Sequence, residues 1–158
     1  MRISREQMFM DIAEVVAKRS ACLRNNVGAV IVNEKNNIVA IGYNGPAAGV
    51  PQCTRDICHA GCDLAIHAED NAILRMPEIE KHYAFMGIPN YKLNNEYKLF
   101  CTVSPCFNCA KLIVNRGDIK EVYYRYEYRE RDGIWYLLSK GIKVYQILSG
   151  GIINEQKL

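Results

Sequence analysis

The chain has 158 residues, of which 49% are hydrophobic and 23% are charged, and this balance excludes a disordered or fibrous protein. Its formal net charge of +3 comes without a long block of lysine or arginine, so the charge demands no nucleic-acid polymer as a partner. There is no apolar run long enough to span a membrane and no signal-peptide core, so no membrane association is expected. We expect one domain over residues 1–158, located in the cytoplasm, or in the host cytoplasm if a phage encodes it.

The first half of the chain predicts a helix, a hairpin and a long loop. A helix is predicted over residues 5–19, because Ser4 and Gln7 have the spacing of a capping box and apolar residues follow at helical intervals. Two β-rich runs, 27–32 and 38–43, flank a short polar turn and predict an antiparallel hairpin. Both runs are nearly continuous in apolar residues, which predicts that helices cover both faces. Residues 44–64 predict an irregular loop that is functional or held by metal.

The second half predicts strands that alternate with helices. A helix over residues 65–76 ends at Pro77, and 77–95 shows little pattern beyond one or two helical turns at 79–86. The remaining predicted elements are strands at 97–103, 121–125 and 142–148, with helices at 106–115 and 131–140 between them. Strands joined through helices lie parallel, by right-handed crossovers. The predicted fold is therefore α/β, a three-layer α-β-α sandwich around a mixed five-stranded sheet whose last two strands are parallel.

Two short motifs indicate the chemistry: His67-Ala68-Glu69, and Cys106 and Cys109 behind Pro105. Each alone is weak, since a histidine at a helix start is often a cap and a CxxC pair also serves in redox or structural zinc sites. Together they match the H-x-E…P-C-x-x-C pattern of zinc nucleobase deaminases. The two cysteines lie three residues apart, so both thiolates face one side of the first turn of a helix, near its positive end.

One imidazole and two thiolates give Zn²⁺ three protein ligands and leave its fourth position open for water, as catalytic sites do. Glu69 lies two residues after His67, so it points away from ligation but can reach that water. We expect Glu69 to act as a general acid/base that moves a proton from the water to ring N3 and later helps protonate the departing ammonia. The alternative is a structural zinc site that is closed by a further Cys or His and leaves Glu69 without a role.

Over nearly its whole length, the chain resembles deoxycytidylate (dCMP) deaminases of bacterial and phage type, within the cytidine deaminase superfamily. The stretches that carry the resemblance are 20–24 leading into 27–32, 42–45, 66–73, 104–111 and 128–129. A helix between the last two strands is similar to this branch, whereas free-cytidine deaminases have an antiparallel final strand. The resemblance implies a cytidine deaminase-like fold and hydrolysis of dCMP to dUMP and ammonia, which supplies dUMP for thymidylate synthesis.

The resemblance also implies contacts along the whole nucleotide. Asn44 would hydrogen-bond the deoxyribose hydroxyl. The Ala68 N–H would bond the base carbonyl, and the Ser104 carbonyl would accept a bond from the exocyclic amine. Tyr128 would stack on the cytosine ring, and Arg24 and Arg129 would hold the 5′-phosphate with their guanidinium groups. Without the resemblance, the two arginines are exposed cations and Tyr128 is an aromatic residue at a strand edge.

The segment Gly42, Tyr43, Asn44 and Gly45 resembles the allosteric site of the same family. The resemblance implies that dCTP activates and dTTP inhibits there, with Mg²⁺ on the triphosphate. It also implies a homo-oligomer, a hexamer built from dimers, with this site near subunit boundaries. From the residues alone, the segment is equally a strand exit bracketed by glycines.

The remaining cysteines raise the question of a second, structural zinc, which some relatives hold. Seven cysteines are an odd number for a disulfide framework, and a reducing compartment does not favour one. The candidate ligands are Cys22, Cys53, Cys62 and one of Cys58 or His59. The spacing departs from that of relatives with longer insertions, which leaves the fourth ligand open, and free buried thiols are the competing interpretation.

Three other functions compete with a dCMP deaminase. A tRNA adenosine deaminase shares the metal and the glutamate, but it usually carries Trp where this chain has Tyr128 and has a more basic surface. A polynucleotide cytosine deaminase needs a basic groove with stacking aromatics, which the sequence does not display. The alternative that is not an enzyme is a zinc-stabilised interaction module.

Overall fold

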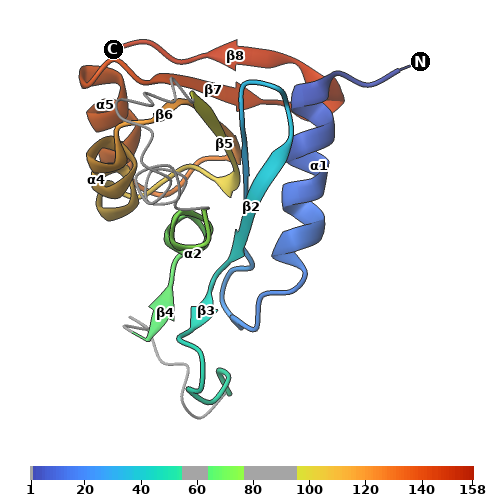
Figure 1. Ribbon diagram of the computed structural model, residues 1–158, viewed down its shortest axis with the longest axis vertical. Helices are drawn as coiled ribbons and strands as arrows, with labels where there is room; N and C mark the ends of the chain where they lie inside the picture. The colour runs from blue at the N-terminus through green and yellow to red at the C-terminus, as the bar shows by residue number, and fades with distance from the viewer. Residues whose placement is uncertain (1, 55–63, 77–95) are drawn as a thin grey trace, which may run out of the picture.

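The computed structural model describes residues 2–54, 64–76 and 96–158, and Figure 1 shows a sheet with helices on both of its sides. The predictions of helical turns at 79–86 and of metal ligation by Cys58, His59 and Cys62 lie outside the described residues. The second helix ends at Leu74, two residues before the predicted end at residue 76. No helix in the described ranges combines the length and the apolar character that crossing a membrane requires.

The chain begins with α1 (Arg5–Ala17), whose start matches the predicted cap because the Ser4 hydroxyl accepts a bond from Gln7 N at 3.0 Å. Strands β1 (Gly28–Val32) and β2 (Ile38–Tyr43) then form the predicted antiparallel hairpin. All five residues of β1 are buried, as expected for a strand covered on both faces. The same expectation is wrong for β2, because β2 is the edge strand of the sheet and leaves Ile38 and Ile41 exposed.

The predicted irregular loop contains a short piece of sheet. Strands β3 (Gly45–Pro46) and β4 (Ala65–Ile66) pair antiparallel in a separate two-stranded sheet. Helix α2 (Ala68–Leu74) therefore starts three residues later than predicted, since β4 takes up residues 65–66 and His67 is the extended N-cap. This arrangement places His67 at the junction of a strand and a helix.

The second half follows the predicted alternation through β5 (Tyr97–Val103), α4 (Phe107–Arg116), β6 (Ile119–Tyr126), α5 (Asp132–Ser139) and β7 (Lys143–Ile147). The pairs β5–β6 and β6–β7 are parallel, which confirms the predicted parallel arrangement of these strands. Gly117 ends α4 with a φ of 83°, a conformation that glycine adopts without steric cost.

The main sheet has six strands in the order β2-β1-β5-β6-β7-β8, so the predicted number of five is wrong. The additional strand β8 (Ile153–Glu155) follows a short 3₁₀ turn, η1 (Ser149–Gly151), and pairs antiparallel with β7. Its three residues are too few to show a periodic pattern in sequence. β5 lies antiparallel to β1, so β1 separates the parallel strands β2 and β5.

The two faces of the sheet are packed with different kinds of residue. On the face covered by α1, here called the α1 face, Phe9, Phe100, Tyr123 and Tyr145 form an aromatic stack with ring centroids 4.5–5.3 Å apart. On the opposite face, here called the α2 face, the buried cluster gathers side chains of α2, α4 and α5 and is rich in alanine. Small side chains let backbones approach closely, and on the α2 face this brings two helix starts together.

Candidate active site

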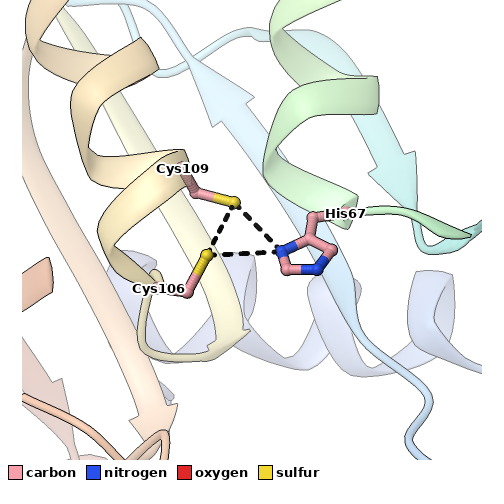
Figure 2. A group of neighbouring side chains, drawn as sticks. All are labelled: His67, Cys106 and Cys109. Atoms are coloured by element: carbon pink, nitrogen blue, oxygen red, sulfur yellow. Dashed lines mark hydrogen bonds between the residues drawn. The ribbon is translucent and has the colours of Figure 1, made fainter. Parts of the chain in front are cut away.

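The two sequence motifs meet where α2 and α4 begin (Figure 2). His67 is the N-cap of α2, Cys106 is the N-cap of α4, and Cys109 lies in the first turn of α4. His67 Nδ1 lies 3.2 Å from Cys109 Sγ and 3.5 Å from Cys106 Sγ, and the two sulfur atoms are 3.5 Å apart. Among the described residues, this is the one group of three or more His, Cys, Asp or Glu donors within 4.8 Å of one another.

The size and chemistry of this triangle fit a zinc ion. Zn–S bonds of about 2.3 Å and Zn–N bonds of about 2.0–2.1 Å place neighbouring ligands of a tetrahedral ion about 3.5–3.8 Å apart. The observed separations of 3.2–3.5 Å lie within a few tenths of an ångström of these values. Neither His67 nor Cys106 uses its side chain to cap its own helix, so both donor atoms face the common centre. The donor set supplies three ligands of a tetrahedral site.

The three groups share their protons unequally. A hydrogen bond from Cys109 is the main reason why the pKa of the Cys106 thiol falls to about 3, and burial opposes it. The hydrogen bond to Cys106 is likewise the main cause that raises the pKa of His67 to about 9. The site therefore favours a thiolate at Cys106 before any metal arrives. A metal ion displaces such shared protons when it binds, because its ligands must be thiolates and a neutral imidazole.

Glu69 lies on the first turn of α2 and is only 4% exposed. Burial raises the pKa of its carboxyl to about 7, although the nearby charge of His67 works in the opposite direction. A carboxyl with a pKa near neutrality can both accept and return a proton at physiological pH. Its position beside the triangle, outside the three ligand atoms, is the one expected for a general acid/base.

A cavity of about 710 Å³ opens beside the triangle. Its volume falls within the range of about 300–1,000 Å³ that is usual for small-molecule sites. His67, Glu69 and Cys106 line the cavity. So do all six residues predicted to contact the substrate: Arg24, Asn44, Ala68, Ser104, Tyr128 and Arg129. Of the four residues predicted for an allosteric site, Asn44 is the one that lines this cavity.

Two buried polar residues fix the walls of the cavity. The amide of Asn44 accepts a bond from Val27 N and donates one to Asn25 O, both at 2.8 Å. One amide hydrogen of Asn44 is left over for a ligand, since the NH₂ group carries two. The Ser104 hydroxyl accepts a bond from Tyr128 N at 2.7 Å, which leaves the Ser104 carbonyl out of that bond. The cavity lining is thus tied to the start of β1 and the end of β5, which are neighbours in the sheet.

The rim of the cavity is positively charged. Arg24 and Arg129 are both exposed, and the Arg129 guanidinium lies 5.5 Å from the centre of the Tyr128 ring. The same guanidinium is 3.4 Å from the Glu130 carboxylate in a solvent-exposed pair, which is too weak to hold it in place. Two exposed cations at a cavity that an aromatic ring also lines suit an anionic ligand with a flat base.

Sequence reasoning missed several residues of the site. Asn25 and Glu127 also line the cavity, and their one signal was adjacency to Arg24 and Tyr128. Cys22 lines it too, although the sequence assigned it to a second zinc. Gly133 was missed as well: a Cβ there would lie 2.0 Å from the Pro105 carbonyl oxygen, so this glycine lets α5 pack against the turn that holds Cys106. These roles depend on contacts between distant segments.

The proposed second zinc site remains a prediction. Cys22 and Cys53 are half-buried, and the other three candidates lie in the part of the chain that is not described. Gly42 has a packing role of its own, because a Cβ there would lie 2.2 Å from the Ala68 carbonyl oxygen. That close approach accounts for this glycine without an effector.

The chain is similar in sequence and in fold to known nucleotide deaminases. A family model described as the cytidine and deoxycytidylate deaminase zinc-binding region matches residues 3–126. ComE operon protein 2 of Bacillus subtilis is 36% identical over 160 residues, covering 99% of this chain and 78% of that protein. Deoxycytidylate deaminase of Schizosaccharomyces pombe is 33% identical over 138 residues, covering 80% of this chain but 38% of that protein. A dCMP deaminase of the cyanophage S-TIM5, solved in complex with dCMP and dUMP, is 34% identical with a TM-score of 0.72, covering 92% of this chain and 98% of that one.

Proposed function

The chain belongs to the family of cytidine and deoxycytidylate deaminases, and from this membership we propose that it hydrolyses dCMP to dUMP and ammonia in the cavity beside His67, Cys106 and Cys109. The observation that carries the proposal is the convergence of three ligand atoms, a buried glutamate and a nucleotide-sized cavity at two helix starts. The relatives named above that act on dCMP support the choice of substrate.

The proposed reaction needs an activated water molecule and a group that transfers protons. A zinc ion on the three ligands would supply the Lewis acidity that activates a water molecule for attack on C4 of the base. Glu69 would take one proton from that water and deliver it to N3 of the ring. As the carbonyl forms at C4, the same carboxylate would take the remaining hydroxyl proton and pass it to the leaving amine, which departs as ammonia. The raised pKa of Glu69 suits both directions of transfer, because neither protonation state is strongly favoured near neutral pH.

We assign each of the predicted substrate residues that line the cavity to one part of the nucleotide. The Ala68 N–H and the Ser104 carbonyl would bond the base carbonyl and the exocyclic amine, and the spare amide hydrogen of Asn44 would bond the deoxyribose hydroxyl. Tyr128 would stack on the base. The exposed guanidinium groups of Arg24 and Arg129 would hold the 5′-phosphate in the forked geometry that arginine offers.

The test is ammonia release from dCMP compared with cytidine, a tRNA stem-loop and single-stranded DNA. The proposed function requires turnover of dCMP well above the other three, whereas preference for the stem-loop or for DNA would indicate the rival deaminases. No release from any of the four would favour a zinc-stabilised interaction module.

In the same assay, Glu69→Gln should lower kcat by at least about 100-fold, since general acid–base catalysis contributes about 10²–10⁴-fold. Its zinc content should stay at the wild-type level, because Glu69 is not a ligand. Glu6→Gln on the α1 face is the matched control and should match wild type. A Glu69→Gln variant with intact zinc and full turnover would rule out the mechanism.

We further propose that dCTP activates and dTTP inhibits the enzyme, each with Mg²⁺, at a site that includes Gly42, Tyr43, Asn44 and Gly45 of a homo-hexamer, and that the dUMP formed feeds thymidylate synthesis. The resemblance over this segment supports the proposal. So does the charge around Tyr43, whose ring centre lies 5.9 Å from the Arg19 guanidinium and 5.5 Å from that of Arg75. Rates with dCMP that neither triphosphate changes would reject regulation and leave the deaminase activity standing.

A further inference from the structure

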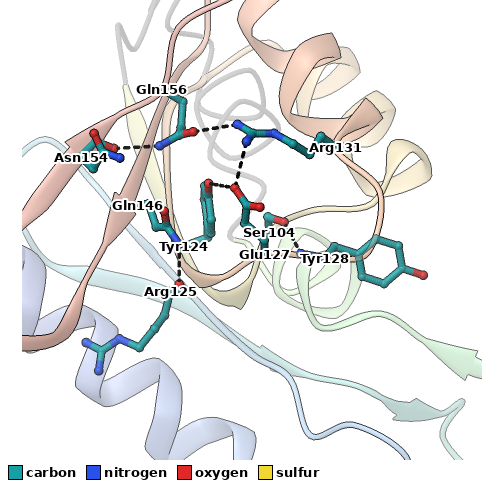
Figure 3. Close-up of polar contacts among 9 residues, drawn as sticks. All are labelled: Ser104, Tyr124, Arg125, Glu127, Tyr128, Arg131, Gln146, Asn154 and Gln156. Carbon is teal, nitrogen blue, oxygen red and sulfur yellow. Dashed lines mark hydrogen bonds and ion pairs between the residues drawn. The ribbon is translucent and has the colours of Figure 1, made fainter.

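The link between β6 and α5, residues 127–131, carries two of the residues that we assign to the nucleotide, Tyr128 and Arg129. Glu127 precedes them and lines the same cavity. A carboxylate beside a phosphate site is unfavourable by charge alone, so its own contacts need an explanation. Figure 3 shows those contacts together with Tyr128, whose ring points away from them.

The carboxylate of Glu127 is held from two sides. Tyr124, a fully buried residue of β6, donates its hydroxyl to Glu127 Oε1 at 3.3 Å. Burial raises the pKa of Tyr124, so its hydroxyl remains a neutral donor at any ordinary pH. On the other side, Arg131 Nη1 lies 3.2 Å from the same oxygen. This pair is 41% and 39% exposed, less than the 74% and 63% of the Arg129–Glu130 pair, and each of its members has a second partner. One contact comes from the rigid sheet and the other from the start of α5.

Arg131 has a second partner directly after the last strand of the sheet. Its Nη2 donates to Gln156 Oε1 at 2.9 Å, and Gln156 is itself fixed by a backbone bond from its N to Val144 O at 2.8 Å. The side-chain amide of Gln156 also donates to Asn154 O at 3.2 Å. The guanidinium fork of Arg131 therefore bridges the cavity wall and the segment that contains β8 (Figure 3).

From this bridge we propose that Arg131 is a positioning residue for nucleotide binding, acting through Glu127 and anchored by Gln156. Arg131 fixes the Glu127 side chain and with it the path of the backbone into Tyr128 and Arg129, and it neutralises the carboxylate that would otherwise repel a phosphate. The inference deepens the proposed function and rests on it. The bridge ends at residues that bind the nucleotide and touches neither His67 nor Glu69, so its loss weakens binding more than it slows the chemical step.

The first test is steady-state kinetics with dCMP on the zinc-loaded protein. Arg131→Met should raise KM about 5- to 20-fold with kcat within about threefold, and a fivefold rise corresponds to about 1 kcal/mol of binding. Gln156→Leu should raise KM about two- to fivefold. Gln156→Glu keeps an acceptor oxygen for Arg131 and should stay near wild type. The double variant Arg131→Met/Gln156→Leu should be no worse than Arg131→Met alone, because both changes break one bridge.

The matched control is Arg116→Met, which removes an arginine paired with Asp118 at 2.9 Å at the end of α4, away from the cavity. A KM rise in Arg116→Met equal to that in Arg131→Met would overturn the proposal, as would a KM for Arg131→Met within twofold of wild type. Equal losses of kcat and zinc content in Arg131→Met would also overturn it, since they would indicate general damage to the fold.

Amide hydrogen exchange separates the bridge from the activity. In both Arg131→Met and Gln156→Leu, peptides covering residues 126–129 should exchange faster than in wild type. Without the bridge, the link opens more often, and each opening breaks the bond from Tyr128 N to Ser104 Oγ. Peptides from α1 should be unchanged. If the wild-type protein does not deaminate dCMP, the proposed function fails, and exchange still decides whether the bridge holds this link. Unchanged exchange at 126–129 would reject the bridge even in an active enzyme.

Discussion

The α1 face and the α2 face of the sheet use the same packing device for different ends. A Cβ on Gly28 of β1 would lie 2.1 Å from the carbonyl oxygen of Ala13 in α1, and a Cβ on Gly42 of β2 would lie 2.2 Å from that of Ala68 in α2. Each glycine thus removes a side chain so that a helix backbone can touch the sheet. On the α1 face the helix contributes nothing to the cavity among the described residues, whereas on the α2 face it begins with His67 and carries Glu69.

The other residues packed on each face differ in the same way. Aromatic rings stacked under α1 bury large areas and stabilise the fold without exact placement of the helix. Alanines under α2 leave little freedom in the distance between helix and sheet, and this distance sets where the His67 ring and the Glu69 carboxyl lie. We infer that the α2 face gains catalytic geometry from its close packing, and that the α1 face serves stability alone.

The largest expected effect comes from comparing substitutions at two buried cysteines, of which one is a candidate metal ligand and the other belongs to the core on the α2 face. Cys109→Ser removes a metal ligand and should lower zinc affinity by more than about 100-fold and abolish turnover, since even changes beyond the ligand shell cost about 10–100-fold. Cys101→Ser alters a fully buried thiol whose one described bond is to Tyr123 O at 3.5 Å. It should lower the free energy of unfolding by about 1–3 kcal/mol and leave zinc content and kcat unchanged.

The measurements are zinc per chain by elemental analysis, thermal unfolding and the dCMP assay. Zinc retained at wild-type affinity in Cys109→Ser would remove the triangle as the metal site. Loss of zinc from Cys101→Ser would show that the metal site depends on core packing across the α2 face. It would then contradict the separate roles given to the ligand and the core cysteine.

Much of the fold could be predicted because its elements are long and periodic. The helix behind Ser4 and the strand at 97–103 were found because caps and runs of apolar residues are local signals. β8 was missed because three residues carry no period, and the start of α2 was misplaced because β4 depends on pairing with β3. The exposure of Ile38 and Ile41 was missed for a similar reason, since the sequence of β2 does not say that it lies at the edge.

The next largest expected effect is a difference in kcat between alanine variants of the two glycines. Gly28→Ala and Gly42→Ala should each lower the free energy of unfolding by about 1–3 kcal/mol, the usual cost of overpacking, because both force a helix away from the sheet. Gly42→Ala should in addition lower kcat by about 10- to 100-fold, since a shift of roughly 1 Å at a catalytic group can cost that much. Gly28→Ala should keep its kcat per folded molecule.

Chemical denaturation combined with active-site titration gives both quantities for each variant. Equal losses of kcat in the two variants would contradict the division of roles between the faces. A Gly42→Ala variant with normal kcat would show that α2 can move without displacing Glu69 from the reacting atoms.

The residues that meet at the candidate site could be picked out from sequence because the chemistry restricts their types and spacing. Zinc is bound by His and Cys side chains, and each of the two motifs places its chemical groups within three residues: His67 and Glu69 in one, Cys106 and Cys109 in the other. The Arg131 bridge could not be predicted, because Glu127, Arg131 and Gln156 are ordinary surface residue types whose contact depends on where β8 returns to the sheet. Ser104 lies between these cases: its carbonyl was predicted for the substrate, but its bond to Tyr128 N was not.

The smallest effect compares two buried hydroxyls at the end of β5. Ser104→Ala removes the acceptor for Tyr128 N at 2.7 Å, and Thr102→Val removes the acceptor for Gly28 N at 3.2 Å. Each leaves a backbone N–H without its partner, so each should lower the free energy of unfolding by about 1–3 kcal/mol. Ser104→Ala alone should raise the KM for dCMP, by about 3- to 10-fold, because Tyr128 lines the cavity while Gly28 packs against α1. Matching KM values in the two variants, measured at equal zinc content, would mean that the wall holding Tyr128 needs no support from Ser104.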